Sequence, residues 1–257
     1  MSRLPRMAER DLQPELMDQP ELAADEHHRA LNGLARCNIL SNSAGSMWPA
    51  IQSLARQQGK RPLRILDLAT GGGDVILRLW RKAKRARLRL SIQGYDISPR
   101  AIEHAQHKSS EASGDLCFKQ ADVLRDKLPE GFDVVMSSLF LHHLTRVEAV
   151  QLLRKMAAAS KTMVLINDLE RCLSGYLLVR AATPLITRST VVHSDGLRSV
   201  AGAFSLEESQ QLAIDAGLAT AQIRRCWPFR FVLTWKKPSR DSVCQENATR
   251  REREALV

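Results

Sequence analysis

Hydrophobic and polar positions follow two alternating patterns along the chain. Short apolar runs, typical of buried strands, are separated by stretches in which apolar residues recur every three or four positions, as in amphipathic helices. The runs that predict strands are 63–68, 90–96, 115–122, 132–140 and 162–168. This order predicts an α/β fold with a mostly parallel sheet and helices on both faces.

Local signals mark the starts of several predicted helices. Ser98 is a favourable N-cap and is followed directly by a proline. Thr145 with Glu148, and Ser205 with Glu208, have the spacing of capping boxes. We therefore expect one helix to begin at each of these three points.

The last third of the chain departs from simple alternation. Residues 169–204 are too many for an unstructured loop, so we expect a helix of their own, with Ser174 as N-cap and Pro184 as its end or kink. We interpret this insertion as a wall of a substrate pocket. The stretch 220–235 contains two strand-like runs joined by a turn, which predicts a C-terminal antiparallel hairpin.

These patterns divide the chain into four parts. We predict a flexible leader over 1–20, amphipathic helices over 21–60, the main domain over 61–236 and a charged, disordered tail over 237–257. No apolar run approaches the roughly twenty residues of a membrane helix, and the first residues lack a signal-peptide core. We therefore expect no membrane span and a cytoplasmic location.

Charge and cysteine content limit the kinds of partner and metal that we expect the chain to bind. The net charge of +10 is a reason to consider nucleic acid as a partner. Much of the excess lies in one run, 78–90, without interleaved aromatic residues that could stack on bases, so we do not expect a nucleic-acid partner. The five cysteines are scattered without a C-x-x-C pair, which argues against a disulfide framework and a zinc site, and we predict no metal.

The most informative motif, "ILDLATGGGD", lies at the end of the first predicted strand, where α/β sheets bind ligands. It lacks the third glycine of a dinucleotide fingerprint and the Lys-Ser/Thr of a phosphate-binding loop. What remains is an acid, a small residue and two glycines at alternate positions: Asp67, Ala69, Gly71 and Gly73.

This motif resembles the first motif of class I S-adenosylmethionine-dependent methyltransferases, in which glycine is commonest at the position of Ala69. The resemblance implies a Rossmann-like, doubly wound sheet of seven strands, an N-terminal helical cap and S-adenosyl-L-methionine as methyl donor. It implies cofactor contacts from Asp67, Ala69, Thr70, Gly71 and Gly73.

Three later segments extend the resemblance, each at the end of a predicted strand. Asp96 matches the acid that binds both ribose hydroxyls, and Ile97 would lie against the adenine. Asp122 would accept from the adenine amino group, while Val123 packs on the ring. Ser138 belongs to the loop that passes beneath the methionine part of the cofactor.

Further stretches, at 187–205 and near both ends of the domain, resemble bacterial methyltransferases encoded beside type III polyketide synthases. This implies O-methylation of a small phenolic or quinol-type acceptor. C-methylation, as in ubiquinone and menaquinone synthesis, an RNA methyltransferase and a non-catalytic cofactor-binding protein remain alternatives. The oligomeric state is not predicted.

Histidines are the candidates for removing a phenolic proton, because they titrate near neutral pH. His193 is followed by Asp195, which could orient it as a base, and His143 is the alternative. Both could instead be loop residues held by hydrogen bonds. On the N-terminal helices, Arg36 or Arg29 could bind the methionine carboxylate.

Overall fold

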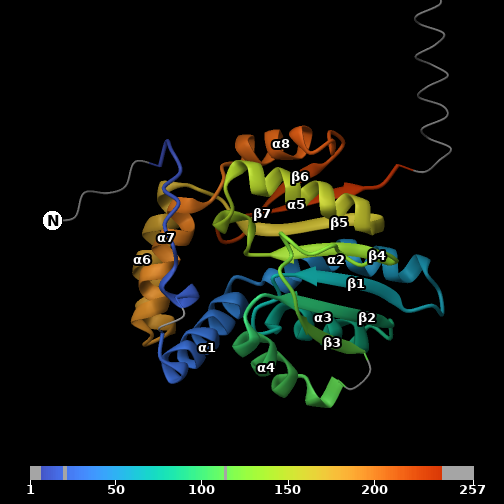
Figure 1. The fold of residues 1–257 in the computed structure, drawn as a ribbon, viewed down its shortest axis with the longest axis horizontal. Helices are drawn as coiled ribbons and strands as arrows, with labels where there is room; N and C mark the ends of the chain where they lie inside the picture. Colours follow the sequence, from blue (N-terminus) through green and yellow to red (C-terminus); the bar gives the residue numbers. More distant parts are fainter. Residues whose placement is uncertain (1–6, 20–21, 113–114, 239–257) are drawn as a thin grey trace, which may run out of the picture.

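The structure of the chain is a computed structural model, which describes residues 7–19, 22–112 and 115–238. These residues form a seven-stranded sheet in the order β3-β2-β1-β4-β5-β7-β6 (Figure 1). β1 to β5 are parallel, whereas β7 is antiparallel to both β5 and β6. The strands are β1 (Leu63–Leu68), β2 (Leu90–Asp96), β3 (Leu116–Gln120), β4 (Phe132–Ser138), β5 (Ser160–Leu169), β6 (Gln222–Cys226) and β7 (Arg230–Lys236). The predicted fold class, including the hairpin, is confirmed.

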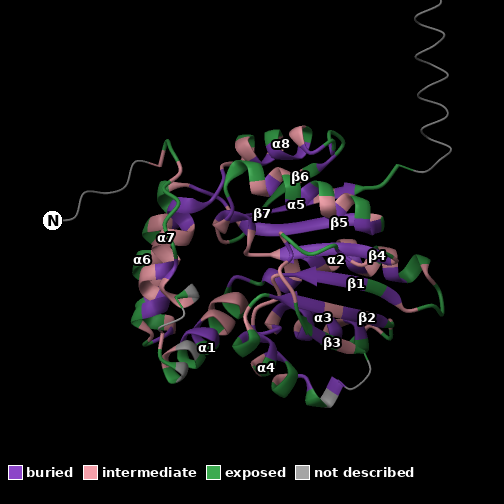
Figure 2. Ribbon diagram, viewed as in Figure 1, coloured by how far each residue is buried: buried purple, intermediate pink, exposed green. Residues whose placement is uncertain are grey.

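Successive strand residues face opposite sides of the sheet, which creates two cores. Helices α5 (Arg146–Ala159) and α8 (Leu206–Asp215) pack on one face. Helices α2 (Ser43–Gln57), α3 (Asp74–Arg85) and α4 (Pro99–Lys108) pack on the other. The central strands are therefore buried on both sides (Figure 2).

The three predicted helix starts are confirmed. The Ser98 hydroxyl accepts the backbone N–H of Ala101 at the start of α4. Both capping boxes are formed, at the starts of α5 and α8. These signals were readable because a cap depends only on residues within one turn of the helix end.

The insertion contains two helices, α6 (Leu173–Ile186) and α7 (Thr190–Gly202), where the sequence predicted one. The N-cap of α6 is Cys172 rather than Ser174, and Pro184 lies inside the helix, two residues before its end. The start of α7 is rich in β-branched residues, which have low helix propensity. Packing against α1 and α6 stabilises it as a helix.

The predicted helical segment 21–60 has two different roles. α1 (Ala24–Leu40) lies over the carboxyl end of the sheet, where Leu31 is beside Gly72. In contrast, α2 is part of the sheet core, with Met47 fully buried. Only α1 therefore fits the expected cap.

The predicted leader is packed in the part that the structure describes. The Asp11 N–H donates to the Ala201 carbonyl at 3.0 Å. The Arg10 side chain donates to the carbonyls of Gly202 and His142 at 2.8 and 3.1 Å. Residues 7–19, with the short 3-10 helix η1 (Leu16–Asp18), thus lie against α7 rather than forming a flexible leader.

The predicted leader and the predicted tail lie partly outside the described residues, at 1–6 and 20 and from 239 onward. The remaining short elements are the 3-10 helices η2 (Ser110–Ala112) and η3 (Leu141–His143). Among the described residues, no helix has both the length and the apolar character needed to cross a membrane.

Candidate active site

The turn between β1 and α3 contains the glycine motif. Ala69, Gly71 and Gly73 have φ angles of 54°, 55° and 74°, all in the left-handed region. A methyl group on Gly73 would lie 2.8 Å from the Phe118 ring, whereas one on Gly71 would meet no described atom within 4 Å. The turn therefore packs tightly on one side and leaves room for a ligand beside Gly71.

Ala69 is the one residue of this turn whose conformation is strained, because its Cβ crowds the backbone at positive φ. We expect Ala69→Gly to raise the free energy of unfolding by about 0.5 to 1 kcal/mol, after subtraction of the greater freedom of glycine in the unfolded chain. Urea denaturation measures this change. Ala157→Gly, inside α5, is the matched control and should lower stability by about 1 kcal/mol. A lower midpoint for Ala69→Gly would contradict the left-handed turn.

Asp96 ends β2 next to this turn. Its carboxylate accepts the Gly71 N–H at 2.7 Å and the Ser98 N–H at 2.9 Å, one on each oxygen. A carboxylate has about four acceptor positions, so a group fixed in this way suits a pair of hydroxyl donors. The adjacent Ile97 side chain is 64% exposed and presents an apolar surface beside the carboxylate.

Asp67, at the end of β1, is only 2% exposed. Its Oδ1 atom has no hydrogen-bond partner among the described residues, and neither has the hydroxyl of Thr70. Burial raises the pKa of Asp67 to about 7; the neighbouring Thr70 side chain opposes this shift, and the nearby Asp96 charge adds to it. Buried polar atoms without partners are rare, so this crevice fits a ligand that supplies donors or positive charge.

Of the remaining cofactor candidates, Asp122 and Val123 follow β3, whereas Ser138 is the last residue of β4 rather than part of the loop after it. Asp122 accepts two backbone N–H groups of its own turn, at 3.0 and 3.1 Å, and Val123 is buried in the core. The Ser138 hydroxyl donates to the Asn167 side chain at 3.5 Å. These contacts stabilise the loops at the ligand end of the sheet, and the predicted adenine contacts stay predictions.

The two arginine candidates both lie on α1. Arg36 is exposed, and Arg29 pairs with Asp25 at 2.9 Å on the helix surface. The residue of α1 that lies beside the glycine turn is Leu31. This geometry therefore gives no support to the prediction that Arg36 or Arg29 binds the methionine carboxylate.

The expected pair of His193 and Asp195 is not formed. His193 Nε2–H donates to the Thr187 carbonyl at 2.7 Å. Asp195 accepts the backbone N–H groups of Leu16 and Met17, at 2.8 and 2.9 Å. The prediction was wrong because residues two apart on a helix point in different directions.

The histidine that an acid does orient is His142. Its Nδ1 lies 2.6 Å from Asp168 Oδ1, at the end of β5. The other Asp168 oxygen accepts the N–H groups of Phe140 and Leu141, at 3.1 and 2.6 Å. Although burial opposes the positive charge, Asp168 raises the pKa of His142 to about 10. Asp168 thus fixes both the loop after β4 and this ring.

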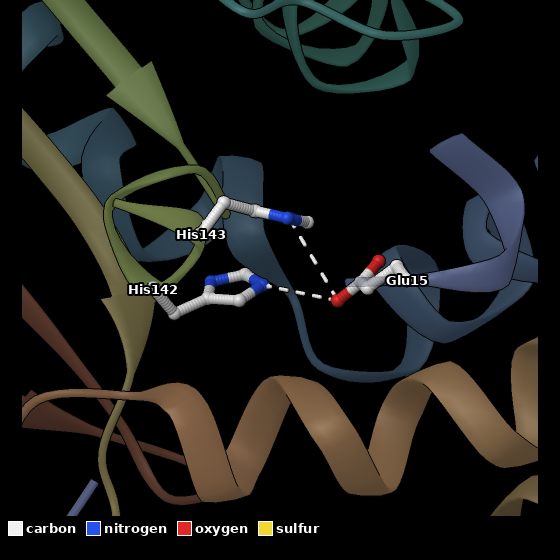
Figure 3. Close-up of side chains that lie close together, drawn as sticks. All are labelled: Glu15, His142 and His143. Atoms are coloured by element: carbon white, nitrogen blue, oxygen red, sulfur yellow. Dashed lines mark ion pairs between the residues drawn. The ribbon is translucent and has the colours of Figure 1, made fainter. Parts of the chain in front are cut away.

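Glu15, from the predicted leader, faces both histidines of this loop (Figure 3). Its Oε1 lies 3.7 Å from His142 Nε2 and 3.8 Å from His143 Nε2. Burial, helped by the neighbouring His142 charge, lowers the pKa of His143 to about 4, so its ring is neutral near pH 7. Sequence reasoning missed Glu15, His142 and Asp168, and only the strand-ending position of Asp168 offered a signal.

Comparison with known proteins agrees with this geometry. Residues 65–162 match the family of methyltransferase domains. Release factor glutamine methyltransferase of Lactococcus lactis is 32% identical over 88 residues, 34% of this chain and 31% of that protein. Demethylmenaquinone methyltransferase of Thermus thermophilus is 33% identical over 109 residues, 41% of this chain and 48% of that protein. The matched regions thus span less than half of either relative.

A solved structure extends the likeness in fold. Magnesium protoporphyrin IX methyltransferase of Synechocystis PCC 6803, crystallised with bound SAH, has a TM-score of 0.52 at 17% identity. The match covers 75% of this chain and 82% of that one. Residues 65–162 are thus similar to a methyltransferase domain, and the described residues share the fold of that solved structure.

Proposed function

We propose that the protein transfers a methyl group from S-adenosyl-L-methionine to an oxygen of a small phenolic or quinol-type acceptor. The observation that carries the proposal is the Asp96 carboxylate, fixed by two backbone donors beside the open face of Gly71. The methyltransferase-domain match and the SAH-bound structural relative support the same cofactor.

The residues of the crevice fit this cofactor in three ways. Asp96 would accept both ribose hydroxyls, and the exposed Ile97 would cover one face of the adenine. Asp67 offers a buried carboxylate to the positively charged methionine end. The sulfonium supplies an activated methyl and its own leaving group, so the chain contributes mainly alignment and exclusion of water. Alignment can lower such a barrier by roughly 7–11 kcal/mol.

The acceptor is proposed to bind beyond the loop after β4. Helices α6 and α7 follow β5 directly, and α7 contacts η3 within that loop (Figure 1). Helix α1 and residues 7–19 pack against α7. These segments together would enclose an acceptor and exclude water, which favours attack by a phenolate on a sulfonium.

A direct test is incubation of the full chain with methyl-labelled S-adenosylmethionine and a panel of alkylresorcinols, naphthols and quinols. Label on an aryl ether oxygen, located by mass spectrometry, is the expected result. Tight SAH binding without transfer to any acceptor would instead support a non-catalytic cofactor-binding protein. Added RNA and release-factor protein serve as comparison substrates, and exclusive labelling of either would overturn the proposal.

C-methylation of a quinol is the second candidate, because one relative is named as a demethylmenaquinone methyltransferase. The same labelled products distinguish the two. A methyl group on a ring carbon survives ether cleavage, whereas one on oxygen is lost.

Cofactor binding should depend on pH through Asp67. Its pKa of about 7 means that the carboxyl is largely protonated at pH 6 and ionised at pH 8. A positively charged ligand prefers the ionised form, so affinity should rise about tenfold from pH 6 to pH 8. Isothermal titration with S-adenosylmethionine measures this, and Asp67→Asn should abolish the dependence. An equal slope in both proteins would exclude Asp67 as the titrating group.

A further inference from the structure

Three side chains with metal-ligating atoms converge beside the loop after β4. We propose that Glu15, His142 and His143 bind one divalent transition-metal ion, with Zn²⁺ the favoured ion. One ligand atom from each residue lies within 4.8 Å of the others, and Figure 3 shows the three side chains facing one another. The proposal does not depend on the proposed function, because ion binding can be measured without a methyl donor or an acceptor.

The spacing of the ligand atoms suits an ion between them. Glu15 Oε1 is 3.7 Å from His142 Nε2 and 3.8 Å from His143 Nε2, beyond the length of a direct hydrogen bond. Zinc–nitrogen and zinc–oxygen bonds are about 2.0–2.2 Å long, which puts two ligands of a tetrahedral ion about 3.4 Å apart. Side-chain shifts of a few tenths of an ångström would bring both pairs to that separation. The two imidazole nitrogens lie within 4.8 Å of each other, so the histidine rings must approach by up to about 1.4 Å.

Asp168 prepares His142 for this role. Its carboxylate lies 2.6 Å from Nδ1 and accepts the proton of that nitrogen, while Nε2 faces Glu15 and releases its own proton to solvent when the ion binds. Metal-binding histidines almost always have such a partner on the second nitrogen. Because backbone N–H groups of the same loop hold Asp168, the His142 ring is oriented before any ion binds.

The donor set favours a first-row transition metal. Two imidazoles and one carboxylate suit Zn²⁺, whereas Mg²⁺ and Ca²⁺ prefer oxygen ligands alone. Three protein ligands leave a fourth position for water or another oxygen donor. The His143 side chain is 25% exposed, against 5% for His142, so solvent reaches the cluster from the side of His143.

The test uses the full chain after treatment with a chelator. Calorimetry with Zn²⁺ and visible spectroscopy with Co²⁺ should show one ion per chain and the bands of four-coordinate cobalt. Glu15→Gln and His143→Ala should each weaken Zn²⁺ binding at least ~100-fold, because loss of a ligand exceeds the ~10–100-fold effect of losing an outer partner. His193→Ala is the matched control and should bind as the wild type does.

Scattered cysteines are the alternative source of Zn²⁺ binding. Binding that is equally strong in Glu15→Gln and His143→Ala, or absent from the wild type, would overturn the proposal. Zn²⁺ should also raise the melting temperature of the wild type and of His193→Ala, but not of the two cluster variants. Circular dichroism checks that each variant is folded. If Glu15→Gln does not fold, His143→Ala alone decides the test, because His143 is the most exposed of the three side chains and its loss should disturb the fold least.

Discussion

Replacement of Asp96 by alanine should weaken S-adenosylmethionine binding at least ~100-fold. Two hydrogen bonds from a diol to a charged group are lost, and each contributes about 1.5–3 kcal/mol. The substitution also releases the N–H groups of Gly71 and Ser98, which the carboxylate now holds at 2.7 and 2.9 Å. Calorimetric titration with S-adenosylmethionine and with SAH measures the change.

Two further variants make this result specific. Asp96→Asn retains the shape and one acceptor oxygen but loses the charge, so its affinity should fall between those of wild type and alanine. Asp215→Ala removes an aspartate that pairs with Arg146 on the surface, and it should leave affinity unchanged. Unchanged affinity in a folded Asp96→Ala protein would refute the assignment of the crevice.

The largest effect on stability is expected at Asp168. This residue is 1% exposed and accepts hydrogen bonds from three backbone N–H groups as well as from His142. Asp168→Ala leaves these donors, and a buried imidazolium, without their partner. We expect the free energy of unfolding to fall by about 3–5 kcal/mol, the usual loss when one member of a buried ion pair is removed.

Urea denaturation of Asp168→Ala, His142→Ala and the double variant forms a cycle that isolates the pair. Because each single substitution already removes the same interaction, the double variant should be less destabilised than the sum of the two. Additive losses would show that Asp168 acts only through the backbone of the loop. Asp133→Ala provides a comparison. Asp133 is a buried acid near the start of β4, whereas η3 follows the end of that strand, and it pairs with the half-exposed Arg61.

The sequence alone predicts those features that depend on residues close together in the chain. Asp67 and Asp96 end apolar runs, so their position at one edge of a parallel sheet follows from the strand pattern. The helix starts at Ser98 and Thr145 were predictable for the same reason. The C-terminal antiparallel strand followed from two strand-like runs separated by only a short turn.

Sequence reasoning failed where distant segments meet. Glu15, His142 and Asp168 come from three parts of the chain, and no local pattern links a residue near the start to the loop after β4 and to the end of β5. The supposed pair of His193 and Asp195 shows the opposite error, in which closeness in sequence was taken for contact although the helix separates the two side chains.

Residues 7–19 lie against α7 and the loop after β4 without pairing with any strand of the described sheet. The Arg10 side chain donates to the carbonyls of Gly202 and His142, and Asp195 accepts the N–H groups of Leu16 and Met17. Substitutions that weaken these contacts would therefore act on the segment while every strand-to-strand hydrogen bond stays in place.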